Sequence, residues 1–94
     1  MRTIRLKYVI CKLKTGVEYA IIFSEKLVHS QILEKSLIKI SSAGFCVIDF
    51  DDMDLNVEVL NEPSTSLNLL PRIEIDETII RNTLLGSIRD YLMF

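Results

Sequence analysis

The first quarter of the chain carries the hydrophobic pattern of two β-strands. In residues 17–23 the large apolar side chains of the odd-numbered positions share one face and Glu18, Ala20 and Ile22 share the other, which is typical of a half-buried strand with its odd-numbered side chains in the core. Residues 4–13 are also strand-like, but their apolar positions change from even to odd near residues 8–11. This phase change predicts either a bulge or a strand covered on both faces. The short connection Lys14-Thr15-Gly16 contains a glycine and therefore predicts a hairpin.

The next segment, residues 24–40, has helical spacing. Its apolar residues recur at intervals of four or five, at Leu27, Val28, Ile32, Leu33 and Leu37. Ser30 is a candidate N-cap, so we expect the regular helix to begin after His29. We expect Ser41-Ser42-Ala43-Gly44 to break the pattern and to separate this helix from the next strand.

The second half repeats the order of strands and helix. Residues 45–50 and 55–60 read as two strands joined by the turn Asp51-Asp52-Met53-Asp54. Residues 61–72 lose periodicity and contain two prolines, which predicts a loop. Residues 74–94 form the last predicted helix, with the apolar stripe Ile75, Ile79, Ile80, Leu84, Ile88, Tyr91 and Leu92.

Two features mark the ends of this last helix. Glu74, Asp76 and Glu77 lie in its first turn, where the helix dipole favours negative charge. Gly86 is expected to kink or end it. Together these elements predict an α+β fold of order ββαββα, an antiparallel sheet with helices packed on it, in a single domain spanning residues 1–94.

Composition then limits the classes of protein. With 49% apolar and 26% charged residues, the chain is neither disordered nor collagenous. Its longest apolar run, residues 19–23, is far shorter than the roughly 20 residues of a membrane span. Basic residues follow one another too closely near the start for a signal-peptide core, so we expect a cytoplasmic protein. The mean hydropathy of +0.30 is high for this size, which suggests that some apolar side chains meet a partner.

The two cysteines, Cys11 and Cys46, both lie in strand-like apolar segments. Free cysteines commonly behave as small buried hydrophobic residues. We therefore interpret both as core thiols. A disulfide between them, or a reactive thiol, stays open as an alternative.

Catalytic signatures are weak. His29 is the single histidine, and the chain has neither a Gly-x-Ser-x-Gly elbow nor a phosphate-binding glycine loop. We interpret His29 as closing the loop before the predicted helix, and we expect no enzymatic activity and no cofactor. The four carboxylates of Asp49, Asp51, Asp52 and Asp54 could suit a hard cation, but their spacing does not fit an EF-hand loop. They are interpreted as solvated turn residues, with no metal.

One alternative function uses hydroxyl groups. Ser64-Thr65-Ser66 could offer hydroxyls and amides to an anion, although a solvated turn is the simpler interpretation. Together with His29 and Ser30, Ser64 and Ser66 are the candidate residues of a small-ligand or nucleotide-binding module.

Charge is distributed unevenly along the chain. Residues 1–39 contain eight basic and three acidic side chains, a net of +5, whereas residues 40–94 contain three basic and ten acidic ones, a net of −7. The basic first hairpin could follow a nucleic-acid backbone, but the acidic total and the few aromatic residues argue against this. Internal pairing of the two halves, or pairing between two copies of the chain, remains open.

The chain ends on the apolar segment Tyr91-Leu92-Met93-Phe94. Chain ends are normally polar and frayed, so we expect these four residues to dock into the core or into a second subunit. They are the candidate interface of a homodimer.

Three short segments resemble a family. His29-Ser30, Ser42-Ala43-Gly44-Phe45 and Glu62-Pro63-Ser64-Thr65-Ser66-Leu67, followed by an acidic start to the last helix, are similar to segments of small phage- and prophage-encoded accessory proteins. The resemblance implies a phage or mobile-element origin and gives no reaction. The small size, the surplus of apolar residues, the uneven charge and the lack of catalytic signatures predict a non-enzymatic protein-interaction module, with inhibition or modulation of a host protein as its candidate role.

Overall fold

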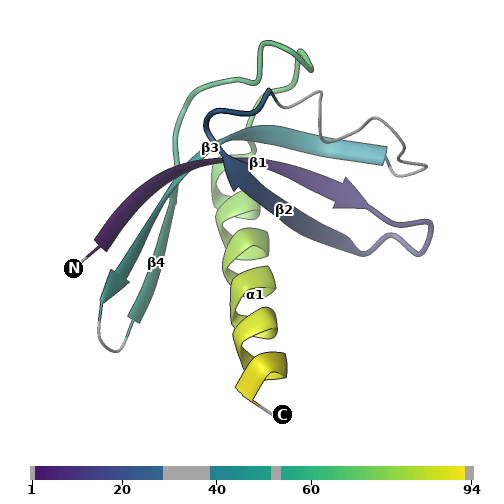
Figure 1. Ribbon diagram of the computed structural model, residues 1–94. Helices are drawn as coiled ribbons and strands as arrows, with labels where there is room; N and C mark the ends of the chain where they lie inside the picture. The colour runs from purple at the N-terminus through teal and green to yellow at the C-terminus, as the bar shows by residue number, and fades with distance from the viewer. Residues whose placement is uncertain (1, 29–38, 52–53, 93–94) are drawn as a thin grey trace.

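The computed structural model describes residues 2–28, 39–51 and 54–92 (Figure 1). Within them it has one antiparallel sheet of four strands and one helix. The strands are β1 (Arg2–Lys12), β2 (Glu18–Ser24), β3 (Lys39–Asp51) and β4 (Asp54–Val59), and the helix is α1 (Ile73–Leu92). The order across the sheet is β2-β1-β3-β4, so β2 and β4 are its edges. The prediction of an α+β fold with an antiparallel sheet is confirmed.

Both predicted hairpins are present. β1 and β2 are joined through Gly16, whose φ of 91° is a conformation that glycine adopts without strain. Leu13 and Val17 close this turn by a backbone hydrogen bond of 2.9 Å. β3 and β4 pair up to Asp51 and Asp54, on either side of the predicted acidic turn.

The region between the hairpins differs from the prediction. The predicted break at residues 41–44 is wrong, because these residues continue β3 and pair with β1. Small side chains are needed there: a Cβ on Gly44 would lie 3.2 Å from the carbonyl oxygen of Glu62 and 3.3 Å from the hydroxyl of Tyr8. Of the predicted helix over 24–40, residues 24–28 are not helical and residues 39–40 are strand, and the rest lies outside the described residues. The order ββαββα is therefore not confirmed, and the described elements follow the order ββββα.

The phase change in the first strand has both of the predicted causes. The pairing of β1 with β3 shifts between Ile10 and Cys11, as a bulge does. Both faces of β1 are also covered. Tyr8 and Ile10 belong to a core beneath α1, and Val9 and Cys11 to a second core against Leu67 and Leu69 of the loop before α1.

The strand β2 is likewise covered on both faces, whereas the alternation predicted only its odd-numbered face in the core. Ala20 and Ile22 pack in the core beneath α1, and Phe23 lies in the second core. The sequence did not reveal this because Ala20 and Ile22 on the even-numbered face are flanked by the polar residues Glu18 and Ser24.

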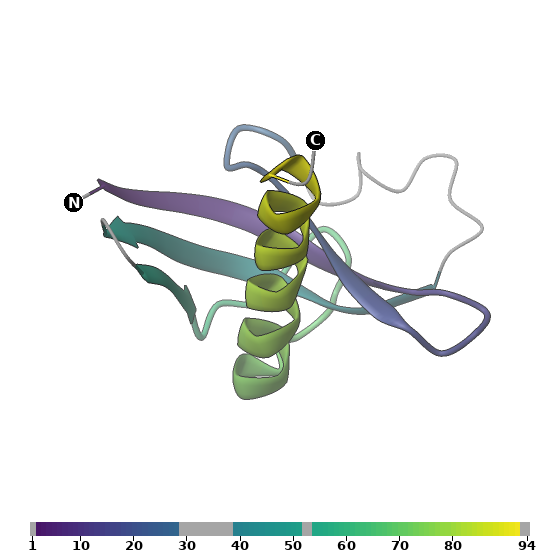
Figure 2. The ribbon, with the colours of Figure 1, turned by 90° about the horizontal axis from the view of Figure 1, so that it is seen from below.

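The sheet bends around α1. Figure 1 shows the strands as two arms with the helix between them, and Figure 2 shows α1 running across the strands on one face of the sheet. As a result α1 contacts both edge strands, β2 and β4. The last turns of α1 extend beyond all strands in Figure 1. Gly86 does not end the helix, because one interior glycine costs only about 1 kcal/mol.

The described helix does not combine the length and apolar character that a bilayer crossing requires.

Candidate functional site

A buried polar cluster surrounds Asp76 in the first turn of α1. The side chain of Asp76 is fully buried. Its carboxylate accepts hydrogen bonds from the hydroxyl of Tyr8 at 2.6 Å and from the hydroxyl of Ser42 at 2.8 Å. The backbone N–H of Arg72 and its Nε donate to the same carboxylate at 2.9 and 3.2 Å. Donors from β1, β3 and the helix start therefore converge on one buried charge.

Arg72 extends this cluster toward the surface. It pairs with both Asp76 and Glu18, the latter at 3.0 Å. Partial burial alone would lower the pKa of Arg72, but the hydrogen bond to Glu18 and the two carboxylate charges raise it. Burial, and then the hydrogen bond to Asp76, raises the pKa of Tyr8 well above its usual range. Hydrogen bonds from Ser41 and Arg72 lower the pKa of Glu18.

This arrangement suits a structural role. Asp76 is saturated with donors and has no exposed surface, so a substrate could reach it only if the helix moved away from the sheet. The cluster ties the start of α1 to β1 and β3. The sequence pattern assigns Asp76 only to the helix dipole and does not reveal the cluster, although its position four residues before the core residue Ile80 places it on the buried face.

The two thiols lie on opposite faces of the sheet. Cys46 belongs to the core beneath α1 and Cys11 to the second core, and both are buried and free. Burial raises the pKa of Cys46 to about 12 and also raises that of Cys11. The interpretation as core thiols is confirmed, and the alternative of a disulfide between them is wrong because the sheet separates them.

The four candidate ligand residues are only partly described. His29 and Ser30 lie outside the described residues. Ser64 is 1% exposed, and its hydroxyl has no hydrogen-bond partner among the residues described. Ser66 is exposed. The loop therefore presents one of its two candidate serines to solvent and buries the other.

The acidic turn is described at its two ends. Asp49 accepts a hydrogen bond of 3.4 Å from Thr3, and Asp54 is exposed. Asp52 lies outside the described residues. Across residues 2–28, 39–51 and 54–92, no three His, Cys, Asp or Glu side chains gather as a metal site would require.

The basic first hairpin is engaged within the molecule. Arg5 pairs with Glu25 at 3.2 Å and with Glu62 at 2.8 Å. Lys7 donates to the carbonyl oxygen of Leu27 at 2.7 Å, and both basic groups lie over the ring of Phe45, at 5.0 and 5.5 Å from its centre. The pair between Arg5 and Glu62 joins the basic and acidic halves of the chain.

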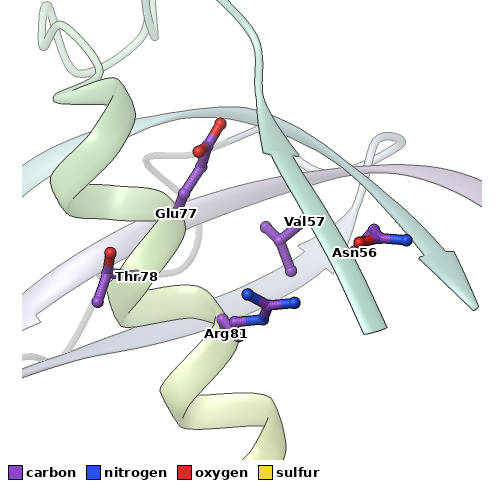
Figure 3. Close-up of a pocket in the computed structure, with 5 residues that line it drawn as sticks. All are labelled: Asn56, Val57, Glu77, Thr78 and Arg81. Carbon is purple, nitrogen blue, oxygen red and sulfur yellow. The ribbon is translucent and has the colours of Figure 1, made fainter. Parts of the chain in front are cut away.

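A small pocket lies where α1 meets the edge strand β4 (Figure 3). Its volume is about 160 Å³, and its lining residues are Asn56, Val57, Glu77, Thr78 and Arg81. Glu77 accepts a hydrogen bond of 2.9 Å from the backbone N–H of Val59, and Arg81 donates one of 2.8 Å to the carbonyl oxygen of Leu55. Side chains of α1 thus form hydrogen bonds with backbone groups of β4 that would otherwise be open to a further strand.

A side chain of α1 also caps the opposite edge of the sheet, β2. The backbone N–H of Ala20 in β2 donates to the hydroxyl of Thr83 at 3.2 Å. Both edges of the sheet are therefore partly covered by one helix, which limits strand pairing to the backbone groups left open between the caps. Glu77, Arg81 and Thr83 are not recognisable as edge caps from the sequence, because these roles depend on the bend of the sheet around α1.

A wider, open groove of about 570 Å³ lies between the first hairpin turn and α1. Gly16 and Glu18 form one wall, and Glu74, Ile75, Thr78 and Ile79 form the other. Glu18 at its rim pairs with Arg72 at 3.0 Å.

Comparisons of the chain with models of known families, with curated proteins and with solved structures gave no match.

Proposed function

We propose that the chain is a non-enzymatic protein-interaction module that acts as a homodimer, of phage or prophage origin. The origin is supported by the three short segments around Ser30, Gly44 and Ser64. The interaction role is supported by how the fold uses its polar and apolar side chains.

The buried polar groups support a role without catalysis. Tyr8, Ser42 and Arg72 each donate a hydrogen bond to the buried carboxylate of Asp76. Catalytic groups need to reach a substrate and to have a pKa near the working pH. Burial raises the pKa of Tyr8 and of both thiols, which makes these groups poor acids and poor nucleophiles.

The exposed apolar side chains of α1 are the observation that carries the proposal. Ile73 is 38% exposed and Leu85 is 41% exposed, with Glu77 and Arg81 between them at the same four-residue spacing, whereas Ile75, 53% exposed, lines the separate groove beside β2. The helix also continues beyond the strands to Leu92 (Figure 1). Exposed apolar surface that gathers on one element is typical of an interaction site. Glu77 and Arg81 on the same helix carry opposite charges, so a second copy of the chain would present an Arg81 to Glu77 and a Glu77 to Arg81.

Molar mass in solution tests this proposal. Light scattering coupled to gel filtration, over low to high micromolar concentrations, is expected to give twice the monomer mass of 10.8 kDa. A constant 10.8 kDa at every concentration would reject self-association.

A paired substitution tests whether α1 is involved. Leu85→Glu is expected to shift the protein toward monomer, because it places a charge in an apolar contact. Asn82→Glu is the matched control, since it adds the same charge at an exposed polar position on the same helix. Equal effects of the two substitutions would mean that net charge, and not the apolar contact, controls association.

A further inference from the structure

Within the described residues, both outward backbone groups of Val57 at the outer edge of β4 are open, whereas Leu55 and Val59 each have one outward group bonded to α1. Strand pairing alternates, and Leu60 donates inward to Phe45 of β3, so residues 55, 57 and 59 point their N–H and C=O groups away from β3. Arg81 occupies the carbonyl of Leu55, and Glu77 occupies the N–H of Val59. In the described part of the chain, no hydrogen bond is made to the outward groups of Val57, and Val57 is one of the residues that line the pocket beside Glu77 and Arg81.

The helix beside this edge carries a stripe of four residues spaced four apart: Ile73, Glu77, Arg81 and Leu85. This spacing places them along one side of α1, and the bonds of Glu77 and Arg81 show that this side follows β4. The helix runs antiparallel to β4 here, because Arg81 meets the start of the strand and Glu77 its end. The stripe is apolar at both ends, with opposite charges between them.

The stripe is self-complementary. Reversing its direction places Ile73 opposite Leu85 and Glu77 opposite Arg81, and both pairs have their midpoint at Ile79. On the strand, Val57 is midway between the residues that Arg81 and Glu77 cap. One two-fold axis through the pocket can therefore satisfy the strand and the helix together, as a symmetric dimer requires.

We propose that two copies of the chain join about this axis, with β4 pairing at Val57 and the two stripes packing side by side. The N–H and C=O of Val57 bond to those of the partner's Val57 as an antiparallel pair. Glu77 lies against the partner's Arg81, and Ile73 against the partner's Leu85. The strand contact is confined to Val57, because Arg81 and Glu77 cap the neighbouring outward groups of Leu55 and Val59. This inference rests on the proposed homodimer and names its interface.

Charge substitution with mixing is the decisive experiment. Glu77→Lys places an ammonium group against the partner's Arg81, and Arg81→Glu places a carboxylate against the partner's Glu77. Each variant alone is expected to weaken the dimer roughly tenfold or more, because like charges meet twice at a symmetric interface. An equimolar mixture of the two variants restores both opposite-charge contacts and is expected to restore dimer mass.

The mixture separates association from folding. Each substitution also removes a hydrogen bond to β4 within its own chain, and mixing does not return that bond. Recovery of the dimer on mixing therefore reports contact between the chains. Glu74→Lys makes the same charge change on α1 in the groove beside β2, and it is expected to leave the dimer unchanged.

Proline at Val57 tests the strand contact separately. Val57→Pro removes the outward N–H and no bond to β3, a position where an edge strand tolerates proline. Val57→Ala loses more side-chain volume and keeps the N–H, so it is the control for packing. We expect Val57→Pro to give folded monomer, by circular dichroism and light scattering, while Val57→Ala remains dimeric.

Three results would overturn this interface while leaving a homodimer in place. The first is a dimer unchanged by Glu77→Lys and Arg81→Glu. The second is failure of the mixture to restore the dimer. The third is dissociation only when Tyr91, Leu92, Met93 and Phe94 are replaced by serine, which would place the interface at the chain end. A wild-type protein that is monomeric at all concentrations would instead reject the proposed self-association itself.

Discussion

Asp76 and Glu77 are neighbours in the sequence and carry the same charge, yet the fold uses them in opposite ways. Asp76 points into the molecule, has no exposed surface and accepts bonds from three residues. Glu77 points along the edge of the sheet and bonds to a single backbone N–H of β4. Successive residues of an α-helix point about 100° apart, so Asp76 lies in the core while Glu77 lies at the surface.

The difference shows which polar groups of this protein a partner could contact. In the Asp76 cluster both carboxylate oxygens accept hydrogen bonds from within the chain, so a change there should affect stability. At the β4 edge, the charges of Glu77 and Arg81 flank backbone groups of Val57 that point outward. A change there should affect association or local dynamics with little effect on the core. Substitutions in the two regions should therefore separate these effects.

The largest effect is expected from removing the buried carboxylate. Asp76→Ala leaves the hydroxyls of Tyr8 and Ser42 without their acceptor and leaves Arg72 with Glu18 as its remaining partner. We expect the free energy of unfolding to fall by about 2–5 kcal/mol, because two buried hydroxyls are each left unsatisfied at a cost of about 1–3 kcal/mol. Urea unfolding followed by circular dichroism measures it. A loss below about 1 kcal/mol would show that the cluster does not hold α1 to the sheet.

A smaller effect is expected when one donor of the cluster is removed. Tyr8→Phe deletes the hydroxyl that donates to Asp76 at 2.6 Å. We expect a loss of about 1.5–3 kcal/mol, the range for hydrogen bonds to charged groups. Tyr19→Phe removes a hydroxyl from another tyrosine of the sheet that does not contact Asp76, and it should cost about 1 kcal/mol or less. Equal losses in the two variants would contradict a special role for the buried bond.

The sequence predicted the elements with strong local patterns. The alternation in residues 17–23, the glycine turn before it and the acidic turn near residue 52 were enough to identify both hairpins and the sheet. The last helix followed from its apolar stripe and its acidic first turn. In each case the signal lies within the residues that form the element.

The failures occurred where distant residues determine the structure. Ser42, Ala43 and Gly44 look like a break, but β1 pairs with them and Tyr8, Glu62 and Pro71 leave room only for small side chains. The capped edge of β4 was missed for the same reason. Glu77 and Arg81 cap β4 only because the sheet bends around α1, and neither residue type nor spacing encodes that bend locally.

At the sheet edge we expect a local effect. Glu77→Ala removes the acceptor of the Val59 N–H, and we expect a loss of about 0.5–1.5 kcal/mol. Amide hydrogen exchange followed by NMR should show faster exchange at Val59 with unchanged protection at Val9 in the centre of the sheet. Glu77→Gln keeps an acceptor oxygen and should keep Val59 protected. Faster exchange throughout the sheet would show that Glu77, like Asp76, supports the core.

The smallest effect is expected at the surface end of the Asp76 cluster, as a change in pH dependence. The pKa of Glu18 is lowered in the folded state by hydrogen bonds from Ser41 and Arg72. A lowered folded-state pKa contributes stability above the unfolded pKa of about 4.3, and this stability is lost as the pH falls through the folded-state pKa. We expect Glu18→Gln to remove that acid-sensitive contribution, worth about 0.2–1 kcal/mol for a pair this close to solvent.

Thermal unfolding between neutral and acidic pH measures the contribution of Glu18. The variant should be less stable than wild type at neutral pH, and the two curves should converge as the pH falls below the lowered pKa. Glu58→Gln makes the same charge change at an exposed position on β4 and should keep the wild-type slope. A constant difference between Glu18→Gln and wild type at every pH would mean that Glu18 acts through packing and not through its charge. In that case Arg72, and not Glu18, would be the outermost charged residue of the Asp76 cluster.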